Sequence, residues 1–324
     1  MKTFSDPVVG TRLQRYSLNG QTMGTRYTAV FYAPAGLNTT AVGASLFAAV
    51  DKVDRQMSTW NPASDLCRLN AALVNDWIAI PRELLHVVET GLQVTLQSNG
   101  AFDMGVGDLV QAWGFGPSPR APSSQLAEAQ KKSTYCPATA ATLEVDRASH
   151  QVRKLAPLAI DLCGIAKGYG VDQLAQCLDE WNIDSYLVGI DGEMRARGVK
   201  PGASAWAVAI EKPAYGVREV SGVMELQEMA IATSGDYRHW VDLAGKRFAH
   251  TMNPGLRQPV SNRLAAVTVL APTCILADAW ATALLVLGED AGVALAQERS
   301  MDALFVLRDG YQLQELWIMD GNRQ

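Results

Sequence analysis

The chain has 324 residues, 48% of them hydrophobic, and its 28 basic and 33 acidic residues give a formal charge of −5. A chain of this length can bury a large core, either in one big domain or in two lobes. Since no basic block stands out, we expect no electrostatic nucleic-acid surface. No apolar run reaches the roughly 18–20 residues that span a bilayer, so we do not expect an integral membrane protein.

The N-terminal stretch MKTFSDPVVGTRLQRYS lacks the apolar core and the small-residue cleavage site of a signal peptide. We interpret residues 1–16 as a flexible leader and residues 17–324 as the working domain. The five cysteines form no C-x-x-C pair, and the four histidines form no H-E-x-x-H or H-x-H pattern. A zinc enzyme is therefore not expected, and the cysteines are more typical of buried hydrophobes.

Apolar periodicity predicts the elements of the N-terminal half. In chain order these are a strand at 25–33, helices at 41–54 and 82–97, a surface loop at 117–124, a short exposed helix at 125–132, strands at 142–146 and 157–162, and a helix at 165–181. Between the first two predicted helices, the dipeptide Asn61-Pro62 is typical of a turn, and Ser64 is a candidate N-cap.

The C-terminal half is richer in predicted strands. The prediction gives strands at 186–190, 205–210 and 221–226, a loop at 232–237, a hairpin around 243–246, a strand at 265–270, an apolar helix at 275–288, and a final hairpin from 302–307 and 313–318. Because helices and strands are mixed through many antiparallel connections, we predict an α+β fold.

The apolar helix ILADAWATALLVLG carries one carboxylate, Asp278, and one hydroxyl, Thr282. Thr273 is the better N-cap, which leaves Asp278 about one turn inside the helix. A lone buried carboxylate costs several kcal/mol, so Asp278 either pairs with a buried Arg or Lys or faces a cleft and holds a cation. Positions i and i+4 share a helix face, and this oxygen pair suits Mg²⁺. The alternative for Thr282 is a hydroxyl bonded to its own helix.

Two further stretches have a chemical and a structural interpretation. In IDLCGIAKGYGVD a predicted strand ends at Asp161, and a helix begins with Lys167 in its first turn. Free N–H groups there would suit a phosphate, but a plain strand-to-helix turn fits as well. His250, beside the turn Asn253-Pro254-Gly255, is either acid–base machinery or a structural histidine.

Eight ordered blocks together resemble the FAD:protein FMN transferases, the ApbE-type flavin transferase family. They are TMGTRYT (22–28), STWNPASDLCRLN (58–70), GAFDMGVGDLVQAWGFG (100–116), IDLCGIAKGYGVDQL (160–174), VGIDGEMRARG (188–198), ATSGDYR (232–238), HTMNPG (250–255) and ADAWATALLVLG (277–288). The resemblance implies a single large α+β domain of largely antiparallel sheets and helices, with a cleft for FAD and Mg²⁺. It also implies transfer of FMN from FAD to a Thr or Ser hydroxyl of an acceptor protein through a phosphoester bond, with release of AMP.

The resemblance also implies roles for individual residues. The metal ligands would be the Asp278 carboxylate, the Thr282 hydroxyl and the Gly164 carbonyl, and His250 would join Asp278 as a catalytic residue, as base or phosphate partner. Ser234 and Asp236 would shape the same loop. The cofactor contacts would be Met23, Trp60, Ala101, Phe102, Asp103, Asp161, Lys167 and Met252.

Three positions depart from the family pattern. Cys163-Gly164 replaces the usual Gly-Gly or Ser-Ala, which leaves a carbonyl ligand possible. Asp191-Gly192 replaces a frequent Gly-Gly pair, which would stiffen that turn. Ala281 stands where some members have a second Asp, so fewer protein oxygens would hold the metal.

Two other functions share the same predicted site. One is a Mg²⁺-dependent FAD pyrophosphatase that releases FMN and AMP, and the other is a flavin-binding protein without turnover. The family resemblance implies work outside the cytoplasm on an acceptor protein of a membrane-bound redox complex. We therefore expect a periplasmic location, with a cytoplasmic one as the alternative.

Overall fold

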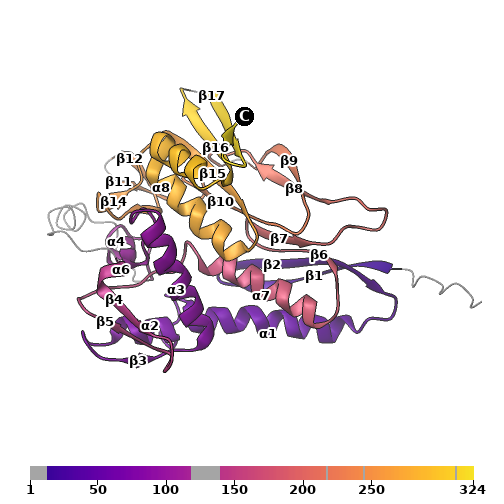
Figure 1. Ribbon diagram of the computed structural model, residues 1–324, viewed down its shortest axis with the longest axis horizontal. Helices are drawn as coiled ribbons and strands as arrows, with labels where there is room; N and C mark the ends of the chain where they lie inside the picture. The colour runs from indigo at the N-terminus through magenta and orange to yellow at the C-terminus, as the bar shows by residue number, and fades with distance from the viewer. Residues whose placement is uncertain (1–12, 118–138, 217, 244, 311) are drawn as a thin grey trace, which may run out of the picture.

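The computed structural model of the protein describes residues 13–117 and 139–324, apart from positions 217, 244 and 311 (Figure 1). The predicted loop at 117–124, except for Pro117, and the predicted helix at 125–132 lie outside the described residues. Strand β1 begins at Leu13, so residues 13–16 of the expected leader pair with the next strand.

A long antiparallel sheet runs through the described part of the molecule (Figure 1). Its order mixes early and late strands, because β6 pairs with β2 and β10 pairs with β7. In spatial order the strands are β1 (Leu13–Thr22), β2 (Thr25–Pro34), β6 (Ser185–Ile190), β7 (Glu193–Arg197), β10 (Ala230–Gly235), β15 (Leu264–Ala271), β16 (Asp302–Asp309), β17 (Gln312–Met319) and β18 (Asn322–Arg323).

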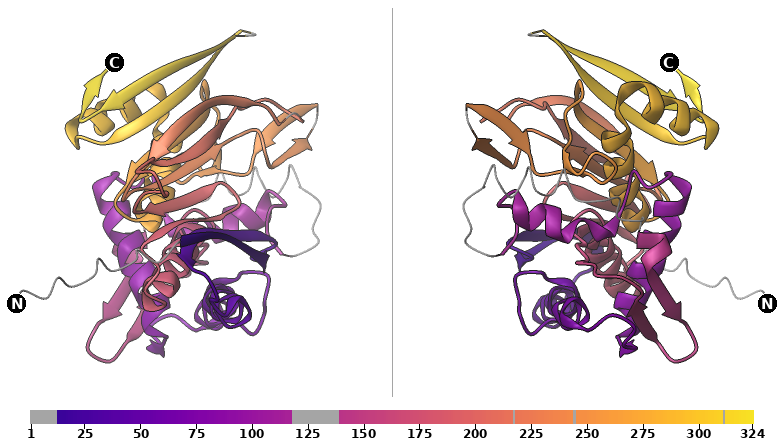
Figure 2. Two further views of the ribbon diagram at one scale, coloured as in Figure 1. Left: turned by 90° about the vertical axis from the view of Figure 1, so that its right-hand side faces the viewer. Right: turned by 90° about the vertical axis from the view of Figure 1, so that its left-hand side faces the viewer.

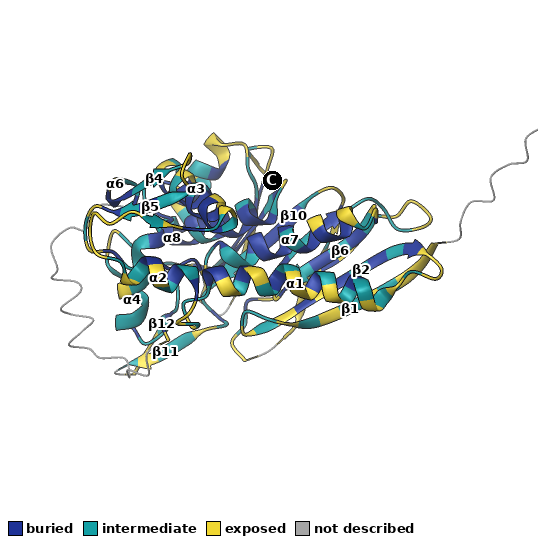
Figure 3. Cartoon of the chain, turned by 90° about the horizontal axis from the view of Figure 1, so that it is seen from below, coloured by how far each residue is buried: buried dark blue, intermediate teal, exposed yellow. Residues whose placement is uncertain are grey.

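Three helices cover one face of this sheet: α1 (Thr39–Met57), α7 (Ala166–Glu180) and α8 (Cys274–Glu298) (Figures 1 and 3). Buried residues alternate along β2, so one face of this strand is apolar. On that face Tyr27, Ala29 and Phe31 are buried and pack in one cluster with the helices. The helix residues in this cluster include Leu46 of α1 and Leu174 of α7. Val30 and Tyr32 point to the opposite face, where they pack with the hairpin of β8 (Trp206–Glu211) and β9 (Val220–Leu226).

Smaller elements surround the ends of the main sheet (Figure 2). Helix α3 (Arg82–Gln97) contacts α8. Helix α2 (Asp65–Ala71) contacts α1 and is capped by the predicted Ser64 hydroxyl. The other small elements are η1 (Met104–Val106), α4 (Gly107–Ala112), α6 (Thr139–Thr142), the sheet β3 (Ile78–Ala79), β5 (Gln151–Lys154) and β4 (Leu143–Asp146), and the hairpins β11 (Trp240–Leu243) with β12 (Lys246–Ala249) and β13 (Met252–Asn253) with β14 (Gln258–Pro259).

Helix α8 is long and apolar enough to cross a membrane by length and composition, which the sequence-based expectation of no such run had missed. In its most apolar window 56% of the residues are buried inside the protein. It packs against β10, β15 and α7, and its backbone breaks at Gly288, where φ is +83°. The helix therefore forms part of the core.

The predicted α+β class is confirmed by this arrangement, but several local predictions were wrong. Residues 157–162 have no strand, and residues 230–235 form strand β10 instead of a loop. Strands β5 and β7 were not predicted. Alternation of apolar and polar residues is a weak signal in segments this short. Hydrogen bonding to partners elsewhere in the sheet decides whether such a segment becomes a strand.

Candidate active site

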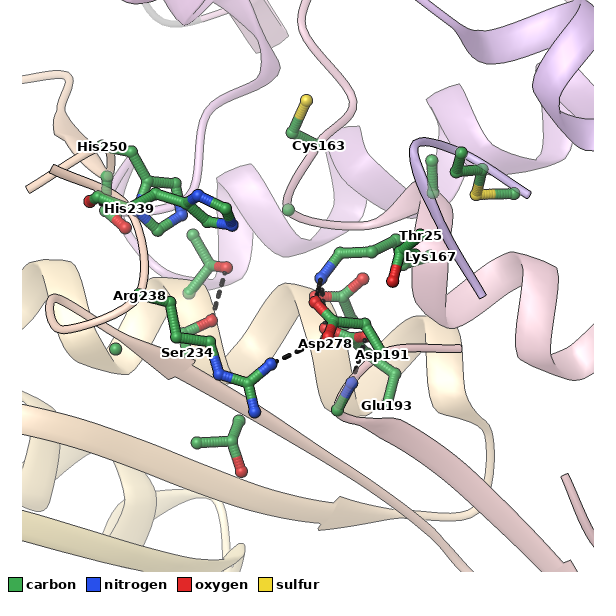
Figure 4. A pocket seen from close by; sticks show the side chains of 18 of the residues that line it. Thr25, Cys163, Lys167, Asp191, Glu193, Ser234, Arg238, His239, His250 and Asp278 are labelled. Carbon is green, nitrogen blue, oxygen red and sulfur yellow. Dashed lines mark hydrogen bonds and ion pairs between the residues drawn. The ribbon is translucent and has the colours of Figure 1, made fainter. Parts of the chain in front are cut away.

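A pocket of about 1270 Å³ opens where α7 and α8 meet the turns of the main sheet. Every residue to which the sequence analysis gave a metal, catalytic or cofactor role lies in its wall. These residues are Met23, Trp60, Ala101, Phe102, Asp103, Asp161, Gly164, Lys167, His250, Met252, Asp278 and Thr282. Figure 4 shows side chains from strands, helices and loops turned toward this space.

Asp278 is only 3% exposed, yet its side chain belongs to the pocket wall. The Gly168 N–H donates to its Oδ2 at 2.9 Å. Burial, and then the nearby Glu193 carboxylate, raise the pKa of Asp278 to about 7. Among the described residues Asp278 makes no ion pair, but the Lys167 ammonium is near enough to act against the rise in its pKa. The carboxylate therefore lines the pocket and also lies near a lysine.

The Thr282 hydroxyl lies one turn further along α8 and also faces the pocket. It shares a hydrogen bond of 3.0 Å with the Ser234 hydroxyl of β10, so it is bonded to a neighbouring strand. The backbone of Gly164 packs against it, because a Cβ added at Gly164 would lie 3.1 Å from Thr282 Oγ1. Asp278, Thr282 and Gly164 thus line the same pocket, with Gly164 beside Thr282.

These oxygens suit a hard divalent cation. Among the described residues, no three His, Cys, Asp or Glu side chains gather as a metal site. A cation at Asp278 would therefore also need neutral oxygens, which Thr282 and the backbone can supply. Mg²⁺ accepts such a mixed set and completes it with water and substrate phosphates.

Helices α7 and α8 cap each other. Gly168 in the first turn of α7 donates to Asp278 on α8, while Asp172 on α7 accepts from the N–H groups of Cys274 and Ile275 at the start of α8, both at 2.9 Å. Thr273 is the N-cap residue of α8, as predicted, but its side chain makes no capping hydrogen bond. Two buried carboxylates thereby fix the register of α8 on α7.

This capping also corrects the phosphate interpretation of the α7 start. The N–H of Gly168 is taken by Asp278, and the N–H of Ala166 donates to the carbonyl of Leu162 at 2.8 Å. Those two donors are not free for a ligand. The Lys167 ammonium at this helix end binds Glu193 Oε1 at 2.6 Å.

Lys167 keeps its charge in this environment. Burial disfavours the ammonium, but Glu193, Asp278 and Asp191 together outweigh burial and raise the pKa of Lys167 above its ordinary value. A fully charged Lys at the pocket wall is suited to attract a phosphate.

His250 directly follows β12 and lies against two aromatic rings. Its ring meets His239 edge-on at 5.4 Å between centroids, and Phe115 at 6.3 Å. Its Nδ1 lies 3.3 Å from the His239 carbonyl oxygen, an arrangement in which Nδ1 donates and Nε2 can accept a proton. Burial, and then the His239 ring, lower the pKa of His250 to about 4, so the imidazole is neutral near pH 7.

The remaining residues predicted to contact the cofactor differ in how exposed they are and in whether their polar atoms already have hydrogen-bond partners. Trp60 is 65% exposed at the pocket rim, whereas Phe102 is buried in the main core. Asp103 Oδ1 accepts from the Gly105 N–H in its own loop, and Oδ2 accepts from the N–H of Thr139 at the start of α6. Asp103 therefore shapes the wall by joining its loop to α6. Asp161 likewise accepts from the Cys163 N–H at 2.8 Å.

Asp236, which we grouped with Ser234, does not line the pocket. Both of its oxygens bind the Arg308 guanidinium at 2.6 Å. Three further pocket residues make strong interactions but had no predicted role, namely Glu193, Arg238 and His239. Glu193 and Arg238 lie inside quoted family blocks, but their spacing did not reveal that Glu193 binds Lys167 or that Arg238 binds Asp191 and Glu211.

Solved structures of flavin transferases share this fold. The chain superposes on the flavin transferase ApbE from Vibrio cholerae with a TM-score of 0.83 and 33% identity, covering 94% of this chain and 97% of that one. The apo flavinyl transferase ApbE of Pseudomonas stutzeri gives a TM-score of 0.82 with 33% identity, covering 95% and 96% of the two chains. The fold and the pocket thus place the protein in a class of transferases.

The sequence comparisons define the family. The ApbE family model matches residues 23–305. The FAD:protein FMN transferase of Haemophilus influenzae is 36% identical over 301 residues, which cover 90% of this chain and 86% of that protein. The enzyme of the same name from Vibrio cholerae is 34% identical, with 92% and 90% covered. The chain belongs to the ApbE family.

Proposed function

We propose that the protein transfers FMN from FAD to a Thr or Ser hydroxyl of an acceptor protein, with Mg²⁺, and releases AMP. The observation that carries this proposal is the buried Asp278 carboxylate, placed with the Thr282 hydroxyl and the Gly164 backbone in the wall of a large pocket. The names of the relatives support the FAD and acceptor parts of the proposal.

The reaction exchanges one phosphorus–oxygen bond for another. The acceptor oxygen bonds to the FMN phosphorus, the bond to the bridging oxygen of the diphosphate breaks, and AMP leaves with that oxygen. A Mg²⁺ ion held by Asp278, Thr282 and the Gly164 carbonyl would neutralise charge on the diphosphate.

The protein's own residues have three tasks in this scheme. His250, which its lowered pKa keeps neutral near pH 7, accepts the proton of the acceptor hydroxyl at Nε2. Lys167 offers a permanent positive charge to the phosphates. Buried side chains such as Phe102 exclude water from the pocket floor, which favours the acceptor hydroxyl over hydrolysis.

The test compares products with and without an acceptor. The purified protein is incubated with FAD and Mg²⁺, and membrane proteins from cells lacking the gene are added as acceptors. We expect flavin that stays bound to a protein band after denaturation, a mass increase of one FMN on a Thr or Ser, and one AMP per flavin attached. FMN and AMP in solution without attached flavin would instead identify an FAD pyrophosphatase, and FAD binding without products a flavin-binding protein.

The location and the partner follow from the same proposal. We propose a periplasmic enzyme that acts on a subunit of a membrane-bound redox complex. Mass spectrometry of membrane proteins from cells with and without the gene would identify the modified subunit. Recovery of the enzyme only in the cytoplasmic fraction would contradict the proposed location.

A further inference from the structure

Asp191 joins two cations in the pocket wall (Figure 4). It lies in the turn between β6 and β7, where its backbone φ of +55° is in the left-handed region. Arg238 Nη1 donates to its Oδ1 at 2.9 Å, and Lys167 Nζ lies 3.8 Å from its Oδ2. The side chain is 26% exposed, so the carboxylate is partly shielded from solvent.

Arg238 is held from the other side by a second carboxylate. Its Nε donates to Glu211 Oε2 at 3.1 Å, and Nη2 donates to the same oxygen. Glu211 ends β8, and Arg238 follows β10, so the guanidinium connects three separate segments of the wall. Three hydrogen bonds to carboxylates leave part of the five-donor guanidinium available to a ligand.

The charges form one row across the pocket wall. Glu193 holds Lys167 at 2.6 Å, Lys167 neighbours Asp191, Asp191 holds Arg238, and Arg238 binds Glu211. All five side chains line the same pocket. Asp191 is the link between the α7 side, with Lys167, and the β8–β10 side, with Arg238.

We propose that Asp191 is a positioning residue for the dinucleotide, because it fixes the Arg238 guanidinium opposite Lys167 so that both cations face the substrate's diphosphate. This inference rests on the proposed function for the identity of the substrate. A guanidinium that is already ordered loses less side-chain entropy when it binds a phosphate.

The opposite role would be simple charge cancellation. A carboxylate between two cations also repels a diphosphate, so removing it would tighten FAD binding if Asp191 did nothing else. The two roles therefore predict opposite signs for the same substitution. A substitution that removes only the charge separates them further.

Two variants make the test. Asp191→Gly removes the side chain without backbone strain, since Gly readily adopts a positive φ. Asp191→Asn removes the charge but keeps an acceptor oxygen for Arg238 and tolerates the left-handed backbone. FAD affinity is measured from the quenching of flavin fluorescence without an acceptor, and KM and kcat are measured with one.

For Asp191→Gly we expect the Kd and the KM for FAD to rise about 3- to 10-fold, the size of the net contribution of one typical hydrogen bond, with a smaller change in kcat. Asp191→Asn should stay within about 2-fold of the wild type, since the rescue depends on the acceptor oxygen. The matched control is Asp320→Gly, which alters another Asp with positive φ, in the exposed turn between β17 and β18, and should leave both constants unchanged.

Tighter FAD binding by both variants would show that Asp191 only cancels charge, and it would overturn the inference. An unchanged Kd for FAD in Asp191→Gly would also overturn it. Wild-type protein that binds FAD but attaches no flavin would contradict the proposed transfer, while the Kd comparison would still decide the role of Asp191. Wild-type protein that binds no FAD would overturn both.

Discussion

Replacing Asp172 by Asn should destabilise the protein by loosening α8 from α7. The Asp172 carboxylate accepts the N–H groups of Cys274 and Ile275 and also binds Arg195 Nη1 at 2.6 Å. An Asn side chain has one acceptor oxygen, and its NH₂ group would face a backbone N–H. The variant therefore loses one capping bond and the charge that complements the helix N-terminus.

The magnitude follows from these contacts. A lost cap costs about 0.5–2 kcal/mol, and hydrogen bonds to a charged group contribute about 1.5–3 kcal/mol. The neutral amide offsets part of this, because burial disfavours the carboxylate and raises the pKa of Asp172. We expect a net loss of about 2 kcal/mol. For 324 residues the entropy of unfolding is about 0.7 kcal/mol/K, so the Tm should fall by about 3 °C.

Thermal unfolding followed by circular dichroism measures this effect. The control is Asp184→Asn, which removes an 81% exposed carboxylate that pairs only loosely with Arg197 at 3.4 Å, and it should change stability by less than about 0.5 kcal/mol. If Asp172→Asn unfolds at the wild-type temperature, the mutual capping of α7 and α8 does not stabilise the fold. In that case the capping would not hold Asp278 in place either.

Three further changes test the site. Asp278→Asn keeps an acceptor for the Gly168 N–H but removes the negative charge. Mg²⁺ binding, measured by calorimetry, and FMN transfer should both be lost, while the Tm stays that of the wild type. Transfer at the wild-type rate would show that Asp278 does not bind the metal. His250→Gln should slow transfer about 100-fold if His250 is the base, whereas a normal rate would make it structural. The folded-state pKa of His250 is about 4, below its ordinary 6.5, so the unfolded chain binds the extra proton, and wild-type stability should fall as pH drops from about 6.5 to 4. In denaturant melts His250→Gln should lose less stability than the wild type over that pH range. If the free energies of unfolding of the two proteins fall in parallel with pH, the lowered pKa of His250 is refuted. In Gly168→Ala the new Cβ would lie 2.3 Å from the Cys274 carbonyl oxygen, so α8 must move. Overpacking of this kind lowers the free energy of unfolding by about 1–3 kcal/mol, and the Tm should fall accordingly. An unchanged Tm would show that the two helices are not in close contact at Gly168.

Local patterns in the chain determined most of the helices. Helix α3 spans the predicted residues 82–97, and α7 and α1 lie within a few residues of their predicted bounds. The spacing of four between Asp278 and Thr282 correctly placed both on one helix face toward a pocket, because helix geometry relates such residues without any knowledge of the fold. The strands were less certain. Strand β7 has five residues, and it is defined by its hydrogen bonds to β6 and β10.

The sequence by itself determined the class of fold, the family blocks and the residues that gather at the site, since periodicity and short motifs reside in neighbouring positions. Only the tertiary structure decided what those residues do to one another. The Gly168–Asp278 and Asp172–Cys274 hydrogen bonds join residues 110 and 102 positions apart, and Asp191 meets Arg238 across 47 positions. The raised pKa of Asp278 and the lowered pKa of His250 come from burial and from charges on other elements. No pattern along the chain encodes those distances, because they are fixed only when α7, α8 and the sheet pack together.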